Sequence, residues 1–241
     1  MTARPVDAMR ERAEVVSRIR AALAAADFPR ALEALAGIAP RKRLKPLYSA
    51  LLDREERVRR RAVVALGTAL AAVAAAHPEE GRELWRNLMW RLSEESGAIG
   101  WGIPEVMGET LARSPLLAGE YARILVGYVR DLPGAATSYL DHPELRRGAW
   151  WGIARLAEAR PDLARQAGDA LPAALKDADP AIRGLACLVA ARTGPPHAPE
   201  VTARLAALAD DTAVFPFSRD DRVETARVAD LARLALEGEG G

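Results

Sequence analysis

The sequence predicts an all-α protein: a right-handed α-solenoid of about five helical hairpins with an N-terminal capping helix or helix pair. Three observations predict this fold. Alanine and leucine, both strong helix formers, dominate a chain of 241 residues that is 50% hydrophobic but only 5% aromatic. No stretch keeps the period-two alternation that is typical of a strand. Apolar residues instead recur at helical spacing in paired segments, and prolines separate one pair from the next.

The segments 6–26 and 28–38 are amphipathic, and we expect residues 1–40 to cap the open end of an array that spans residues 41–241. Because proline starts or ends a helix, the prolines mark the limits of each pair within that array. The expected pairs are 44–53 with 56–76, 80–93 with 98–113, 117–130 with 144–159, 163–176 with 179–193, and 200–209 with 220–236.

The second segment of each pair opens in a related way. A polar start is followed by one aliphatic residue, and the next residue is arginine in three of the five segments. These aliphatic anchors recur at spacings of 37 to 46 residues, which is the period of a two-helix solenoid repeat. The anchors are Val58, Ile99, Leu145, Ile182 and Val223.

The stretch "DADPAIRGLACLVAARTG" resembles the second-helix signature of HEAT repeats, of the short bacterial kind found in phycobilisome lyases. Asp179 and Pro180 would cap and start the helix. Ile182 would anchor it, and Ala186 would permit close packing. The resemblance covers about residues 41–236 and implies a HEAT-like solenoid, but it carries no catalytic residues. "LMWRLSEESGAIGWGIPEVMGE" is also similar to a bacterial family of HEAT-like proteins from which no function can be carried over.

In a HEAT-like solenoid the second helices line the concave face, so residues of adjacent repeats can be aligned on it. Aligning Ile99 with Leu145 places two glutamates, two tryptophans and two arginines on one surface, with Glu94 and Glu95 at its entrance. The expected neighbours are Trp101 with Arg147, Glu105 with Trp151, and Glu109 with Arg155. The predicted binding residues are therefore Glu94, Glu95, Trp101, Glu105, Glu109, Arg147, Trp151 and Arg155.

Two interpretations of this surface stay open. The charges form a salt-bridge ladder between repeats, with the tryptophans packed over it and no ligand needed. Alternatively, they bind a partner, because Glu105 and Glu109 repel each other at i,i+4 spacing and need a compensating cation. "EESGAIG" could also cradle an anion, although Glu94 and Glu95 oppose this.

The poor helix formers of this stretch fit either interpretation. Gly102 and Gly108 fall within the predicted helix and each costs about 1 kcal/mol relative to alanine, which indicates close contact with another backbone or a bound group. Pro104 requires an irregular first turn. Elsewhere, we expect one ring of Trp150 and Trp151 to enter the core and the other to face outward. Trp85, Trp90 and Cys187 are expected in the core.

The composition narrows the function classes. The three histidines lack ligand-spaced neighbours, and no catalytic or nucleotide-binding motif occurs, so we expect no metal and no cofactor. The longest apolar run is too short to cross a membrane, and a single cysteine suits a cytoplasmic protein. Net charge is +1, but residues 1–65 hold 15 basic and 8 acidic residues. This basic end is a solvated face or a contact for nucleic acid or an acidic protein.

We therefore expect a non-catalytic scaffold that binds a partner protein or peptide on its concave face. The resemblance also implies two alternatives. Nucleic-acid binding, as in HEAT-like alkylpurine glycosylases, would use Trp101, Glu105 and Trp151, but residues 66–241 are net acidic. A lyase or chaperone acting on a tetrapyrrole is the other. The sequence does not predict the oligomeric state.

Overall fold

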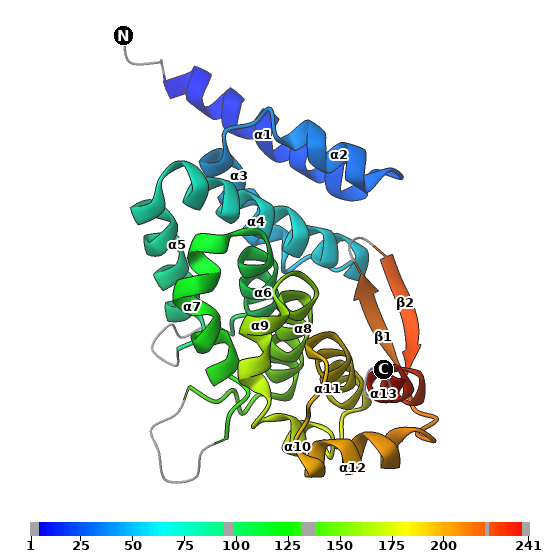
Figure 1. Ribbon diagram of the computed structural model, residues 1–241. Coiled ribbons are helices and arrows are strands. Elements are labelled where there is room, and N and C mark those ends of the chain that lie inside the picture. Colours follow the sequence, from blue (N-terminus) through cyan, green and yellow to red (C-terminus); the bar gives the residue numbers. More distant parts are fainter. Residues whose placement is uncertain (1–4, 94–98, 132–137, 220–221, 238–241) are drawn as a thin grey trace.

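The computed structural model describes residues 5–93, 99–131, 138–219 and 222–237 (Figure 1). These ranges are mostly helical, which confirms the all-α prediction, and they also contain one antiparallel pair of strands. The elements are α1 (Pro5–Ala24), α2 (Phe28–Leu35), α3 (Pro40–Ala50), α4 (Glu56–Ala76), α5 (Pro78–Arg91), α6 (Ile103–Arg113), α7 (Pro115–Gly127), α8 (Pro143–Ala159), α9 (Pro161–Ala164), the 3-10 turn η2 (Arg165–Ala167), α10 (Leu171–Ala174), α11 (Pro180–Thr193), α12 (Pro199–Leu208), β1 (Val214–Arg219), β2 (Arg222–Arg227) and α13 (Val228–Glu237).

The helices stack as a solenoid. The second helices α4, α6, α8, α11 and α13 contact one another in chain order, while the first helices α5, α7 and α9 form a second row (Figure 1). Each hairpin buries its apolar stripe against its neighbours, so one core runs through the whole stack. The prediction of a repeat solenoid is therefore confirmed. Helix α1 contacts α2, α3 and α4 at the N-terminal end of the stack.

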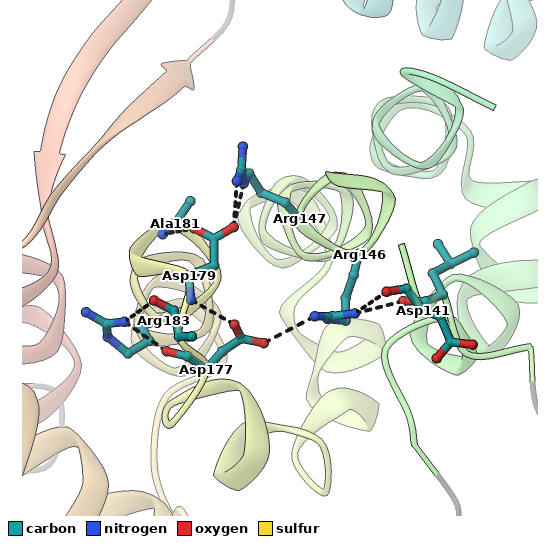
Figure 2. Close-up of polar contacts among 9 residues, drawn as sticks. Asp141, Arg146, Arg147, Asp177, Asp179, Ala181 and Arg183 are labelled. Carbon is teal, nitrogen blue, oxygen red and sulfur yellow. Dashed lines mark hydrogen bonds and ion pairs between the residues drawn. The ribbon is translucent and has the colours of Figure 1, made fainter. Parts of the chain in front are cut away.

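The arginine that follows the anchor closes the turn inside three of the hairpins. Nη1 of Arg183 donates to the carbonyl oxygens of Asp177 and Ala178, at 2.8 and 3.1 Å (Figure 2). Arg59 and Arg146 make the same pair of bonds to carbonyls five and six residues earlier. Carbonyls at the end of a helix lack a partner within it, so the arginine satisfies them. This explains why arginine recurs at that position.

The same arginines also tie one repeat to the next. Nη2 of Arg146 lies 3.7 Å from a carboxylate oxygen of Asp177, in the turn of the following hairpin (Figure 2). Arg183 binds Asp211 of the following turn at 2.8 Å. Asp179 caps α11 as expected, because its carboxylate accepts from the backbone N–H of Ala181 at 2.9 Å. The turns of successive hairpins are thus connected by ion pairs.

The last hairpin differs from the prediction, because its turn is enlarged into the strands β1 and β2. The two strands pair from Val214 opposite Arg227 to Arg219 opposite Arg222. The expected helix over 220–236 therefore begins only at Val228, and the anchor Val223 lies in a strand. Phenylalanine, valine and threonine favour strands, and the buried ring of Phe215 fills the space that the missing side chain of Gly184 leaves.

The start of α6 also differs from the prediction. Gly102 has a φ of 73°, in the left-handed region, and α6 begins after it at Ile103 instead of at residue 98. Pro104 therefore lies in the first turn, where its missing N–H costs nothing. Ile99 precedes the helix and is 52% exposed, so it is not the anchor of this repeat. Ile103 and Val106 of α6 are buried instead.

Three smaller expectations were wrong. The segment 163–176 is divided into α9, η2 and α10, because Pro172 starts a new helix there. Trp150 and Trp151 are both buried, so neither ring faces outward. Trp85 is buried and stacks on Tyr121, but Trp90 is 53% exposed. The burial of Cys187 is confirmed.

Candidate functional site

The glycines of the second helices bring three backbones into direct contact. A Cβ placed on Gly108 of α6 would lie only 2.1 Å from the Cα of Gly152 in α8. Gly67 of α4 receives the side chain of Glu109, and Gly148 of α8 receives that of Glu105. The cost of Gly108 to its helix is thus explained by contact with another backbone, which is one of the two reasons expected from the sequence.

Glu109 lies inside this contact and is 1% exposed. Its carboxylate accepts from Nε of Arg113 at 2.5 Å and from Nε of Arg155 at 2.7 Å. The structure thus brings Glu109 and Arg155 together, but it does not place Glu109 on an accessible surface. Two arginines compensate its charge, so this part of the predicted site forms a ladder between repeats.

Trp151 is not accessible either. It lies on the same stripe of α8 as Arg147 and Arg155, four residues from each, but it is only 8% exposed. Its expected partner Glu105 lies instead against Gly148 of the same helix. Glu94 and Glu95, and with them most of the suggested anion cradle, lie outside the described residues.

The other predicted residues line a pocket of about 460 Å³ at the N-terminal ends of α4, α6 and α8. Trp101, Glu105 and Arg147 meet there, so residues from two predicted repeats share one site. Further residues that were not among the predicted binding residues complete it, from the α3–α4 turn, the N-terminal halves of α4 and α8, and the residue before α6. They are Leu51, Leu52, Glu56, Arg59, Arg60, Val63, Gly102, Glu144 and Leu145.

The charged groups of this pocket are unequally paired. Arg147 binds the carboxylate of Asp179 at 2.7 Å (Figure 2). Arg59 donates a hydrogen bond to the backbone carbonyl of Asp53 in the α3–α4 turn. Glu105 forms only a long ion pair, with Arg60 at 3.8 Å, although its side chain is just 15% exposed. Burial raises the pKa of Glu105 above its ordinary value, and the charges of Arg60 and Arg147 oppose this shift. Glu105 is therefore an incompletely compensated carboxylate.

The rim of the pocket carries apolar groups. Trp101 is partly exposed and meets the ring of His142 edge-on, with the ring centroids 5.0 Å apart. Leu52, at the end of the α3 segment, is 65% exposed. An exposed indole and an exposed leucine beside a buried carboxylate could contact the stem and the charged end of one long basic side chain.

Replacing Glu105 by glutamine tests how the pocket charge affects stability. Because its pKa is raised on folding, the folded protein holds this proton more tightly than the unfolded chain does. The free energy of unfolding should therefore fall as pH rises above the ordinary carboxyl range, and Glu105→Gln should remove that part of the fall. Urea unfolding of both proteins between about pH 4.5 and 8 measures the difference. A glutamine variant that loses stability relative to the wild type as pH rises would contradict the assignment.

Neither a protein-family model nor a curated protein matches this chain. Among solved structures, an engineered protein aligns with a TM-score of 0.50 and 15% identity, over 93% of this chain and 57% of the other. A computationally designed armadillo repeat protein for modular peptide recognition aligns with a TM-score of 0.46 and 18% identity, over 93% and 98% of the two chains. At such identities the likeness concerns the fold alone. The chain folds as an armadillo/HEAT-like α-solenoid.

The solenoid offers few groups for other chemistry. Within the parts of the chain that the structure describes, no three His, Cys, Asp or Glu side chains come together in a group that could hold a metal ion. None of the helices in those parts is long and apolar enough to cross a membrane. The pocket residues that sequence reasoning missed are mainly first-turn residues such as Glu56 and Glu144. They could have been found from their position directly after each hairpin turn, because the N-terminal ends of adjacent second helices lie close together there.

Proposed function

We propose that this solenoid is a scaffold that binds a segment of a partner protein in the pocket formed by α4, α6 and α8. A basic side chain of that segment would bind between Trp101 and Glu105. The observation that carries this proposal is the state of Glu105. Its side chain is only 15% exposed, its ion pair with Arg60 is long at 3.8 Å, and burial raises its pKa against the charges of Arg60 and Arg147. A ligand cation would supply what is missing.

The contrast with Glu109 supports this assignment. Glu109 is more deeply buried, yet two arginines already bind it, so it has no need of a ligand. Glu105 lies on the same helix one turn earlier, faces the pocket, and has Glu144 at the same rim. Two carboxylates beside an exposed indole favour a lysine or arginine side chain, since the cation can contact the ring face as well. We therefore expect the partner segment to be basic at this point.

The two alternative functions gain no support from the geometry. The glycosylase-like interpretation needed Trp101, Glu105 and Trp151 on one accessible face, and Trp151 is buried. The arginines of the pocket also contact carboxylates or backbone carbonyls, which leaves few cations for phosphates. No feature of the described residues favours a tetrapyrrole. A cytoplasmic location stays a prediction from the sequence.

The proposal is tested with two variants in the pocket and one control. Affinity purification with quantitative mass spectrometry would compare the wild type with Trp101→Ala and Glu105→Gln. We expect both variants to lose the main partner and to bind it at least about tenfold more weakly, as for residues at the centre of an interface. Trp90→Ala is the control, because Trp90 is an indole at the surface that does not line the pocket.

Two outcomes would contradict the proposal. In one, Trp101→Ala and Glu105→Gln recover the same partners in the same amounts as the wild type. In the other, Trp90→Ala loses the partner to the same extent, which would place the contact on the row of first helices. Circular dichroism of each variant shows whether the fold is retained.

A further inference from the structure

A second and larger groove lies between α1 and the α3–α4 hairpin, within the basic region of residues 1–65. Its volume is about 1020 Å³. The apolar lining residues that keep some exposure on α1 are Val16 and Ala24, and Val15, Ile19 and Leu23 lie beneath them in the core. Pro46 and Ala50 of α3 form the apolar side opposite. Two antiparallel or crossed helices with an apolar floor between them are the form of groove that receives a third helix.

The walls of this groove carry unpaired positive charge. Arg12 and Arg20 project from α1, and Lys45 projects from α3. All three are exposed, and within the described residues none of them makes an ion pair. Lys42 is different, because it binds Glu11 across the groove. Three carboxylates, Glu11, Asp53 and Glu55, also line the groove, so its five basic residues outnumber the acidic ones. Basic residues also predominate over residues 1–65, by 15 to 8.

We propose that this groove docks an amphipathic helix of a partner protein whose apolar stripe is flanked by acidic residues. The apolar stripe would cover Val16, Pro46 and Ala50, and the flanking carboxylates would meet Arg20 and Lys45. An apolar floor suits a helix better than a nucleic acid, whose backbone needs phosphate contacts and offers no apolar stripe. This site is independent of the pocket at Trp101, because the two share no lining residue.

The probe for this proposal is a pair of synthetic helical peptides of about four turns, or about 14 residues. Both carry leucine at i, i+3, i+4 and i+7. One has glutamate at the flanking positions, and the other has lysine there. Fluorescence anisotropy of labelled peptide would measure binding to the full chain. We expect the glutamate peptide to bind with saturation below about 1 mM and the lysine peptide to bind at least about tenfold more weakly.

Charge reversal on the protein then locates the site. The double variant Arg20→Glu/Lys45→Glu should weaken the glutamate peptide at least about tenfold and should bind the lysine peptide more tightly than the wild type does. Arg192→Glu is a matched control, since Arg192 is an exposed arginine at the end of α11 that lies outside the groove. Trp101→Ala should leave peptide binding unchanged, which separates failure of this proposal from failure of the proposed function.

Several results would overturn the proposal. These are no binding of the glutamate peptide, equal binding of the two peptides, or an effect of Arg192→Glu as large as that of the double variant. Binding of a DNA duplex that competes with the peptide and depends equally on Arg20 and Lys45 would also overturn it, because the groove would then be a phosphate site. A gain in lysine-peptide binding by the double variant cannot result from unfolding, so this measurement stands even where charge reversal lowers stability.

Discussion

Gly108→Ala is expected to lower the free energy of unfolding by about 3 kcal/mol. The added methyl group would lie 2.1 Å from the Cα of Gly152 and 2.4 Å from its carbonyl oxygen, closer than real contacts allow. Both neighbours are backbone atoms, so α6 and α8 would have to move apart along their whole contact. Alanine is the better helix former by about 1 kcal/mol, but this gain is smaller than the cost of separating two packed helices.

Gly119→Ala is the matched control for that variant. Gly119 lies inside α7, and nothing would approach a Cβ at this position within 4 Å. Only the helix preference then acts, so this variant should be more stable than the wild type by up to about 1 kcal/mol. Urea unfolding followed by circular dichroism measures both variants. Equal effects of the two substitutions would show that the contact between α6 and α8 is not as close as described.

Glu109→Gln is expected to cost a comparable amount, about 3 kcal/mol. Glutamine keeps the shape that fits against Gly67, but it removes the charge that binds Arg113 and Arg155. Both guanidinium groups would then remain beside a largely buried neutral group, since their side chains are only 33% and 23% exposed. Breaking a buried pair on one side costs more than the pair contributes, because the remaining charge stays partly desolvated.

The control for Glu109 is Glu200→Gln. Glu200 pairs with Lys176 at 3.0 Å, but both side chains are about half exposed, at 55% and 45%. Water solvates an exposed pair whether or not it forms, so this substitution should change the free energy of unfolding by less than about 0.5 kcal/mol. If the two glutamine variants had the same stability, Glu109 would be a peripheral charge and the ladder between α6 and α8 would not stabilise the stack.

The order of the hairpins could be predicted because helical periodicity and proline positions are local signals. Helix α4 spans the predicted range, and α8 and α11 each begin within one residue of it. The anchors Leu145 and Ile182 are buried as expected. The arginine after the anchor was visible as a pattern, but its role required knowing where the turn carbonyls lie in space.

The start of α6 could not be predicted from the aliphatic pattern alone. Ile99 matched the other anchors in spacing, yet a left-handed residue at Gly102 delays the helix. The contacts between α6 and α8 nevertheless lie close to the predicted offset of 46 residues. Gly108 meets Gly152, which is 44 residues later, and Glu109 binds Arg155, which is 46 residues later. The contact forms because α6 and α8 cross at their glycines.

The sequence Trp-Gly-Ile occurs twice, at 101–103 and at 151–153, and it shows a related limit. Gly102 is needed for a positive φ before a helix, whereas Gly152 is needed because the backbone of α6 touches it. The same residue type is thus required for a local reason at Gly102 and for a tertiary reason at Gly152. Only the local requirement can be predicted from a single sequence. The burial of Glu109 and Trp151 is likewise a tertiary property. Glu109 lies on α6 and Trp151 on α8, and the close approach of the neighbouring helices buries both side chains.

The strands β1 and β2 change what the last repeat can tolerate. The base of this turn is fixed below the strands, where Arg183 binds Asp211 and the backbone N–H groups of Val228 and Ala229 donate to the carbonyls of Ala213 and Asp211. All of these contacts are made at the base of the two strands. Loops of other lengths, or a foreign epitope, can therefore be grafted beyond Phe217 while the stack keeps its register, which makes this position a natural attachment point for new recognition surfaces.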